Sequence, residues 1–390
     1  MRIFYGNFEF EHALCEAVPR SLAEKLRRIN LEIGAALAAL ADDGDFIWLP
    51  EQVETGFSDK LAAAGLPEVR FAREEIDVPN SPELVPWGWT TPLRDWAKRQ
   101  GWQCIAPAQA TVERINSRKF SFELEQEWGC SLDGAAEIHS LDQLAEKLAQ
   151  QPNDGNGWVL KSEFSMSARE RIIGRTTELT APARNWTTSR LATGMSLFFE
   201  PWVERVEEAG LQFTIPEAGP PLLVGITPLL CDALGQYRGS RFGDDPALRL
   251  RWNEAIAIGL KAAERAQSHG YFGPMGIDAM HYRDSAGKER VRPLQDINGR
   301  MTMGRVSLGL RRLLQPGEVG SWLHLRCPAK DEEQAARWYD ELRKMLPTSV
   351  RTVRTSPLTV GGLPVQHATI ATISSDTTSL HDAEQRLLKH

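Results

Sequence analysis

The sequence of 390 residues lacks several features that would place it quickly in a protein class. It has only five cysteines, and they are dispersed, with no CxxC pair: Cys15, Cys104, Cys130, Cys231 and Cys327. An odd, scattered set argues against a disulfide framework and against a zinc site. No apolar run approaches the roughly 18 residues of a membrane helix, and the first residues lack the apolar core of a signal peptide. We therefore expect a soluble, cytoplasmic protein without a membrane partner.

A basic region is also missing. The formal net charge is -7, charged residues make up 25% of the chain, and no long basic run occurs. This balance predicts no nucleic-acid partner. No Ser/His/Asp triad or reactive cysteine is suggested by spacing. At roughly 100–200 residues per domain, the length predicts two or three domains with sizeable cores.

The residues up to about position 110 alternate between strand and helix patterns. Short apolar strands are predicted at 1–5, 45–49 and 102–107, and helices at 21–40 and 92–100. This alternation favours a small α/β unit with a parallel sheet. The tract 53–87 fits no element clearly. Trp87 and Trp89 are better explained by core packing or a domain contact than by the wall of a cleft.

The rest of the chain changes to a mostly antiparallel pattern, which makes the overall class α/β and α+β. We divide it at 111–205, 206–315 and 316–390. The expected elements are helices at 120–129, 141–149, 252–268 and 332–345, and strands at 158–161, 196–199, 211–215, 222–227, 322–327 and 367–374. The last 75 or so residues are expected to form a separate α+β piece.

Two strands predicted at 276–282 and 291–300 carry the most informative side chains. Because alternate residues of a strand share a face, Asp296, Asn298 and Arg300 point the same way. Asp278 on the partner strand can reach that face. Two carboxylates and an amide oxygen suit Mg²⁺ shared with substrate phosphates, and an arginine suits a phosphoryl oxygen. The alternative is a solvated hairpin with an Asp–Arg pair.

Four weaker signals precede this hairpin. Lys119 stands just before a helix, and Lys161 closes an apolar strand; either lysine could reach a phosphate or be merely exposed. The loop that contains Ser165 and Ser167 has small hydroxyl residues that let backbone N–H groups approach phosphates. The segment Phe198-Phe199-Glu200-Pro201-Trp202-Val203 pairs exposed backbone groups with an apolar wall, as a purine requires, although it could be an ordinary strand end.

Taken in order, these motifs resemble the ATP-grasp superfamily of the carboxylate–amine ligase type. The resemblance covers about 111–310, and the preceding unit looks like the pre-ATP-grasp domain. It implies the following roles. Lys119 and Lys161 would contact the phosphates of ATP, with Ser165 and Ser167 in the flap. Glu200, Trp202 and Val203 would bind adenine, and Glu204 or Glu208 the ribose. Asp278, Asp296 and Asn298 would hold Mg²⁺, and Arg300 would stabilise an acyl phosphate.

The chain departs from the family pattern at two places. The family usually has a glutamate where Asp296 stands, and a shorter side chain bridges two metal ions less well. The flap Ser165-Met166-Ser167 lacks the usual glycines, which puts its closure over the phosphates in doubt.

The resemblance implies an ATP-dependent ligase that joins a carboxylate to an amine through an acyl phosphate and releases ADP and phosphate. A kinase on the same scaffold and a non-catalytic nucleotide-binding or sensor module are the alternatives. Small-molecule substrates are expected, amino acids or peptides among them. Arg238 and Arg241 are candidates to anchor a substrate carboxylate, with solvated surface arginines as the alternative. Homo-oligomerisation is left open.

Overall fold

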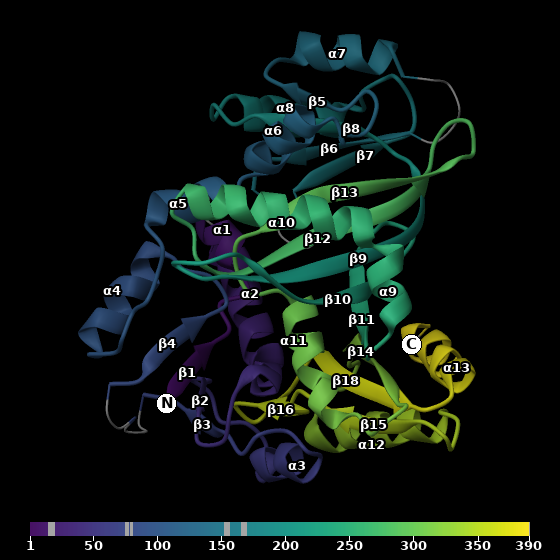
Figure 1. Ribbon diagram of the computed structural model, residues 1–390. Coiled ribbons are helices and arrows are strands. Elements are labelled where there is room, and N and C mark those ends of the chain that lie inside the picture. Colours follow the sequence, from purple (N-terminus) through teal and green to yellow (C-terminus); the bar gives the residue numbers. More distant parts are fainter. Residues whose placement is uncertain (15–19, 75–77, 79–80, 152–156, 165–169, 390) are drawn as a thin grey trace.

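A computed structural model describes the chain except residues 15–19, 75–77, 79–80, 152–156, 165–169 and 390, and the side chains of 20–23. Figure 1 shows an N-terminal unit at the lower left, a small subdomain at the top, and a long central sheet that reaches the C-terminal helices at the lower right. Within the described residues, no helix is both long and apolar enough to cross a membrane.

The N-terminal unit is a parallel sheet with helices on both faces, as the alternating pattern predicted. Its strands run in the order β3-β2-β1-β4: β3 (Arg70–Ala72), β2 (Phe46–Trp48), β1 (Arg2–Tyr5) and β4 (Glu83–Pro86). The helix α2 (Arg20–Ile33) and the 3-10 helix η1 (Gly34–Leu40) cover one face, and α4 (Thr91–Arg99) covers the other. The short helices α1 (Phe10–Leu14) and α3 (Phe57–Ala63) complete it.

Two local predictions in this unit differ from the structure. The expected helix over 21–40 becomes a 3-10 helix at Gly34, where a Cβ would lie only 2.9 Å from Leu49 Cδ2. The fourth strand is Glu83–Pro86, whereas the segment predicted at 102–107 makes only a single bridge between Gln103 and Glu83. A four-residue strand that ends in proline has too short a pattern to be recognised before its partner is known.

The small subdomain is a four-stranded antiparallel sheet with helices packed on it. Its order is β5-β8-β6-β7: β5 (Ala136–Ile138), β8 (Leu197–Pro201), β6 (Trp158–Ser162) and β7 (Arg171–Gly174). The helices are α6 (Arg118–Trp128), α7 (Leu141–Ala149) and α8 (Ala181–Leu191), and α5 (Gln109–Asn116) connects the N-terminal unit to α6.

An eight-stranded antiparallel sheet forms the centre of the molecule. Its order is β13-β12-β9-β10-β11-β14-β18-β15. The strands are β13 (Glu289–Asn298), β12 (Gly273–Arg283), β9 (Glu204–Ile215), β10 (Leu222–Cys231), β11 (Tyr237–Phe242), β14 (Val319–Arg326), β18 (His367–Ser374) and β15 (Arg351–Arg354). A hairpin of β16 (Thr359–Val360) and β17 (Leu363–Pro364) lies apart from it.

The C-terminal segment is not a separate sheet, because β14 pairs with β11 and carries the large sheet onward. Glycines permit this pairing: a Cβ at Gly239 would lie 2.4 Å from the carbonyl oxygen of Trp322. Pairing between strands so distant in sequence leaves no local signal, so the expected boundary at 316 does not coincide with an edge of the sheet. The helices of this part are α12 (Glu332–Lys344) and α13 (Thr377–Leu388).

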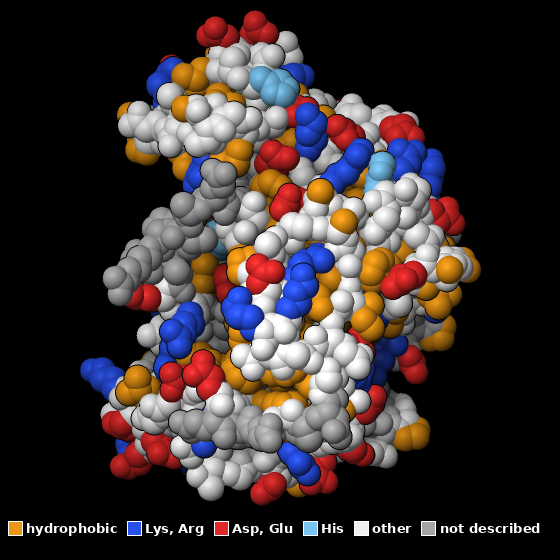
Figure 2. All heavy atoms as spheres, turned by 90° about the vertical axis from the view of Figure 1, so that its left-hand side faces the viewer, with side chains coloured by type: hydrophobic (Ala, Val, Ile, Leu, Met, Phe, Trp, Pro, Cys, Tyr) orange, Lys and Arg blue, Asp and Glu red, His pale blue; other side chains and the backbone are white. Residues whose placement is uncertain are grey.

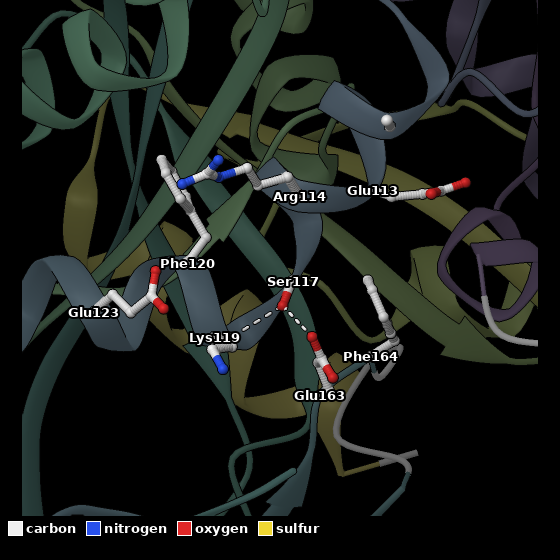
Figure 3. A pocket seen from close by; sticks show the side chains of 9 residues that line it. Glu113, Arg114, Ser117, Lys119, Phe120, Glu123, Glu163 and Phe164 are labelled. Atoms are coloured by element: carbon white, nitrogen blue, oxygen red, sulfur yellow. Dashed lines mark hydrogen bonds between the residues drawn. The ribbon is translucent and has the colours of Figure 1, made fainter. Parts of the chain in front are cut away.

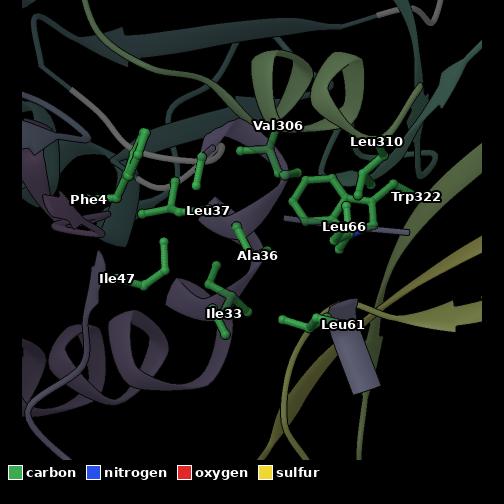
Figure 4. Packing of buried hydrophobic residues seen from close by; sticks show 14 of the residues in the cluster. Phe4, Ile33, Ala36, Leu37, Ile47, Leu61, Leu66, Val306, Leu310 and Trp322 are labelled. Atoms are coloured by element: carbon green, nitrogen blue, oxygen red, sulfur yellow. The ribbon is translucent and has the colours of Figure 1, made fainter. Parts of the chain in front are cut away.

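Alternation along the strands decides which side chains face the site. Leu211, Phe213 and Ile277 pack against α10 (Asn253–Ser268), so Gly210 and Asp278 face the opposite side. The remaining helical segments are α9 (Pro246–Arg251), α11 (Met303–Gly309) and η2 (Leu310–Leu313). A hydrophobic core joins the face of the sheet opposite α10 to the N-terminal unit. It includes Val306, Leu310 and Trp322 (Figure 4).

Candidate active site

The two aspartates predicted as metal ligands lie directly opposite each other on neighbouring strands. Asp278 of β12 is the register partner of Asp296 of β13, and a β-bulge follows Asp278. Asn298 stands two residues further along β13 on the same face, and its Nδ2 donates to Asp278 Oδ2 at 3.5 Å. The hairpin therefore gathers two carboxylates and one amide on the face that is not covered by α10.

This arrangement makes Asp278 an unusual carboxyl group. Its pKa is raised to about 7, first because of burial and then because of the negative charges of Asp296 and Glu208, which outweigh the opposing effect of Arg300. Glu208 comes from β9, next to β12. Glu204, the other ribose candidate, instead lies at the exposed start of β9 and pairs with Arg283 at 3.2 Å. The structure thus brings Glu208, but not Glu204, to the aspartates.

The donor set fits a magnesium ion of the kind that keeps part of its water shell. In the described part of the chain, no group of three or more His, Cys, Asp or Glu side chains is arranged to enclose a metal. Mg²⁺ is usually held by one or two carboxylates, with substrate phosphates and water completing an octahedron. Asp278 and Asp296 supply that number, so an ion here would depend on the substrate for its remaining ligands.

Arg300 lies beside these carboxylates, just after β13 ends. Its Nη2 donates to Asn298 Oδ1 at 2.8 Å and also forms an ion pair with Glu11 of α1. Its guanidinium carbon is 5.5 Å from the centre of the Trp87 ring, a cation–π contact. Trp87 is buried, which agrees with its expected role as a domain contact. The N-terminal unit therefore helps to orient Arg300, which the sequence could not indicate.

On the facing small subdomain, Arg118 approaches the aspartates and Lys119 does not. Arg118 is buried, and its Nη2 donates to Asp296 Oδ2 at 3.2 Å. Lys119 is about half exposed and its Nζ lies 3.5 Å from Glu137 Oε1. Arg118 was missed because the first residue of a helix gives no sign of which way it points. Ser117 is the N-cap of this helix. Its Oγ accepts a hydrogen bond from the amide of Lys119, which fixes the orientation of the first helical turn.

Lys119 instead lines a hollow of about 420 Å³ on the outer side of α5 and α6. Figure 3 shows Ser117 between Lys119 and Glu163, with its hydroxyl bonded to both residues; the distance to Glu163 Oε1 is 2.6 Å. The hollow is also lined by Phe164. The predicted flap residues Ser165 and Ser167 come next in the chain and lie outside the described residues.

Lys161 and Glu200 meet in a buried ionic network that also contains two residues the sequence did not single out. Lys161 Nζ donates to Glu200 Oε2 at 2.6 Å, and Arg292 of β13 donates to both oxygens of Glu200 at 3.0 Å. Arg292 also forms a bidentate pair with Glu125 of α6, in which Nε donates to Oε1 at 2.6 Å and Nη2 donates to Oε2 at 2.7 Å. Arg292 thus connects the central sheet to the helix and the hinge strand of the small subdomain.

The charged groups of this network shift one another's pKa values. Burial raises the pKa of Glu200, yet Arg292 and Lys161 outweigh it and hold that pKa far below its usual range. Burial lowers the pKa of Lys161, and Glu200 only partly offsets this. Glu125 keeps a raised pKa because burial exceeds the effect of Arg292. The carboxylate of Glu200 is therefore paired with two cations, Lys161 and Arg292. The segment that follows Glu200 can contribute its backbone groups.

Trp202 and Val203 follow β8 directly. The amide of Trp202 donates to Gly157 O at 3.0 Å, and the guanidinium carbon of Arg205 lies 4.6 Å from the Trp202 ring centre. Val203 is the last residue before β9. Trp202 and Val203 thus join the two sheets, and their contact with adenine stays a prediction.

The two arginines proposed to anchor substrate both lie on β11. Arg241 binds Glu384 of α13 through Nε at 2.8 Å and Nη2 at 2.5 Å, on the side of the sheet that α10 also covers. Arg238 lies near His324, whose pKa is lowered to about 3 by burial, with small contributions from His367 and Arg238. The structure gives Arg241 a role in holding the C-terminal helix, whereas a contact of Arg238 with substrate stays a prediction.

Comparison with known structures identifies the fold. The chain has the ATP-grasp fold that the order of its motifs predicted. It is similar to N5-carboxyaminoimidazole ribonucleotide synthetase from Thermus thermophilus, with a TM-score of 0.53 and 15% identity, covering 100% of this chain and 98% of that one. For the ADP-bound synthetase from Staphylococcus aureus the values are 0.54 and 9%, with 100% and 95% covered.

A third similar structure is the biotin carboxylase domain of the Hydrogenobacter thermophilus 2-oxoglutarate carboxylase, with a TM-score of 0.53 and 12% identity. It covers 100% of this chain and 89% of that one, and was crystallised with MgADP, ADP and bicarbonate. Comparison with protein-family models and with curated proteins gives no match. Similarity at this level of identity defines the fold, and the chemistry must be argued from the side chains.

Proposed function

We propose that this chain is an ATP-dependent ligase that joins a small carboxylate to an amine through an acyl phosphate, releasing ADP and phosphate. The observation that carries the proposal is the convergence of Asp278, Asp296, Asn298 and Arg300 on one face, opposite Arg118 and Lys161 of the small subdomain. Two of the similar structures named above are complexes, one with ADP and one with MgADP, ADP and bicarbonate, which agrees with a nucleotide between the two sheets.

The residues divide the chemistry between them. A carboxylate is a poor electrophile until transfer of the γ-phosphoryl group gives it phosphate as a leaving group. Arg118 and Lys161 would orient the phosphates of ATP, and Glu200 would hold Lys161 in place. Mg²⁺, held by Asp278 and Asp296, would neutralise charge on the transferring group. Arg300 would then stabilise the oxyanion that forms when the amine attacks the acyl carbon.

Bicarbonate is a second candidate for the carboxylate, favoured by the similarity to a biotin carboxylase domain crystallised with that anion. It would be activated by the same phosphoryl transfer, and Arg238 is a candidate to bind it. Amino acids and short peptides are the other small carboxylates and amines to be tested.

Product analysis decides between these possibilities. The protein would be incubated with ATP and Mg²⁺, with either bicarbonate or a carboxylate pool, and with or without an amine pool. We expect ADP and phosphate to appear only when carboxylate and amine are both present. AMP would contradict the mechanism, because it indicates adenylation. ADP with a stable phosphorylated product and no amine would indicate a kinase. ATP binding without turnover of any pool would indicate a binding module.

Arg118→Gln is expected to weaken ATP binding much more than Lys119→Gln. Arg118 is buried beside Asp296, whereas Lys119 is half exposed and next to Glu137. Loss of a charge-assisted hydrogen bond to phosphate removes roughly 1.5–3 kcal/mol, so the KM for ATP should rise at least about tenfold for Arg118→Gln and less than threefold for Lys119→Gln. Equal effects of the two substitutions on the KM for ATP would contradict the proposed contact between Arg118 and the phosphates.

Asp278→Asn is expected to stabilise the protein without ligand and to abolish turnover. The carboxyl of Asp278 has a pKa of about 7 in the fold, against about 3.9 in an unfolded chain. Between these values the fold binds a proton that the unfolded chain has lost, so stability falls as the pH rises through this window, by about 1.4 kcal/mol per unit of pKa difference at most.

The measurement is the melting temperature of both proteins at pH 5 and pH 8 without Mg²⁺, together with the ligase rate. The gain from Asp278→Asn should be larger at pH 8, where the penalty is fully present. The exposed Asp133, in the loop between α6 and β5, provides a control as Asp133→Asn, which should change neither quantity. A melting temperature of Asp278→Asn below that of the unaltered protein at pH 8, or an active Asp278→Asn enzyme, would contradict the role given to Asp278.

A further inference from the structure

Glu11 is a buried carboxylate next to the site that none of the roles above employs. It lies in α1 of the N-terminal unit, is only 6% exposed, and forms an ion pair with Nη2 of Arg300. Its other oxygen, Oε2, has no hydrogen-bond partner among the residues that the structure describes. A buried carboxylate oxygen that lacks a partner is costly, and it is suited to accept a hydrogen bond from a ligand.

A second carboxylate, Glu9, is close enough to Glu11 for the two charges to influence each other. Glu9, two residues before Glu11, accepts a hydrogen bond from Nδ2 of Asn30. Burial raises the pKa of Glu9, Asn30 opposes the rise, and the charge of Glu11 adds to it. Arg300 itself also donates to Asn298 Oδ1 and to Met301 O at 2.8 Å. The guanidinium that pairs with Glu11 is thus shared with two other acceptors, which leaves Oε2 of Glu11 available to a further cation.

The place of Glu11 relative to the reacting atoms narrows the identity of that cation. Arg300 faces the acyl carbon in the proposed mechanism, and an attacking nitrogen must come within about 3–3.5 Å of that carbon. The N-terminal unit is fixed at this point, since the amide of Met301 donates to Trp87 O at 2.9 Å and the Trp87 ring packs on Arg300. Glu11 is therefore held on the side of Arg300 from which the N-terminal unit closes the site.

We propose that Glu11 binds the acceptor amine in its protonated form and takes its proton through Oε2. This inference rests on the proposed ligase function and adds the substrate class: an aliphatic amine that is an ammonium ion in neutral solution, and not a weakly basic aromatic amine. The ammonium gives one proton to Glu11. The free amine forms a C–N bond to the acyl carbon while the bond from that carbon to the phosphate oxygen breaks, and the second proton leaves with phosphate.

The test compares two nucleophiles in the Glu11→Gln variant, using the carboxylate found by product analysis. Hydroxylamine is uncharged at neutral pH and traps an acyl phosphate as a hydroxamate without needing a carboxylate to bind it. With an aliphatic amine, kcat/KM should fall at least about 100-fold, as for loss of a general base. With hydroxylamine it should stay within threefold of the unaltered protein. Asp59→Asn, an exposed acid on α3, should change neither rate.

Each other outcome has a distinct meaning. An equal fall with both nucleophiles would show that Glu11 only holds Arg300 in place and would overturn the inference, as would unchanged rates with the aliphatic amine. Unaltered protein that uses only an aromatic amine would overturn it too. Failure of the ligase proposal looks different, because the unaltered protein would then form no amide with any amine, whether or not it releases ADP as a kinase would. Should Glu11→Gln melt below the assay temperature, Glu11→Asp, which keeps the charge on a shorter side chain, would be measured instead and should lower only the rate with the aliphatic amine.

Discussion

Replacing Arg292 with glutamine is expected to destabilise the small subdomain by about 3–5 kcal/mol, the usual cost of removing one partner from a buried ion pair. The side chains of Arg292 and Glu125 are each only 2% exposed, and that of Glu200 is 8% exposed. Without Arg292, two buried carboxylates would face each other with Lys161 as their remaining cation in the network. The change should lower the melting temperature by roughly 10 °C.

An exposed ion pair on α6, the helix that carries Glu125, offers a matched control. Arg265 makes a bidentate pair with Glu127 of α6 at 2.7 and 3.0 Å, a geometry close to that of the pair between Arg292 and Glu125. That pair is exposed, so water and salt screen it and Arg265→Gln should leave the melting temperature nearly unchanged. Adding Glu125→Gln to Arg292→Gln should recover part of the loss, because it removes one unpaired charge. If both arginine variants melt alike, burial does not decide the strength of the network.

Arg300→Ala is expected to lower kcat/KM of the ligase reaction by about 10²–10³-fold, the range found when one group that stabilises an oxyanion is removed. The affinity for ADP should change little, because Lys161 and Arg118 remain. Calorimetry with ADP and steady-state rates would be measured on the same preparations. The melting temperature should fall as well, since Glu11 would lose its partner.

Arg241→Gln serves as the control for Arg300, since both arginines were predicted to act on the substrate. Arg241 lies on the opposite face of the sheet, bound to Glu384. Its loss should loosen α13 and leave kcat/KM within about threefold, provided the assay stays below the melting temperature. An Arg300→Ala enzyme with more than a third of normal activity would rule out the assigned role, and a large loss in Arg241→Gln would place the substrate elsewhere.

Much of the site could be predicted because its residues lie close together in sequence. Asp296 and Asn298 are two residues apart on one strand, and a short turn brings Asp278 opposite, so the period of two alone places them on one face. Lys161 and Glu200 were predicted separately, each at the end of an apolar strand. The ATP-grasp fold followed from the order of these motifs and is confirmed by the solved structures.

The tertiary structure decided what depends on contacts between distant segments. Glu11 and Arg300 are separated by most of the chain, and Glu125 and Arg292 by 167 residues. A buried charge can be assigned a partner only when both positions are known. Helix orientation chose Arg118 over Lys119, and the ion pair with Glu384 assigned Arg241 to the support of α13. The sequence by itself determined the chemical groups and their local spacing, because these are set by strand and helix periodicity. Which of them share a site was decided by long-range packing. Burial of whole faces supplies the free energy of that packing, and the choice of partner face leaves no periodic pattern in the sequence.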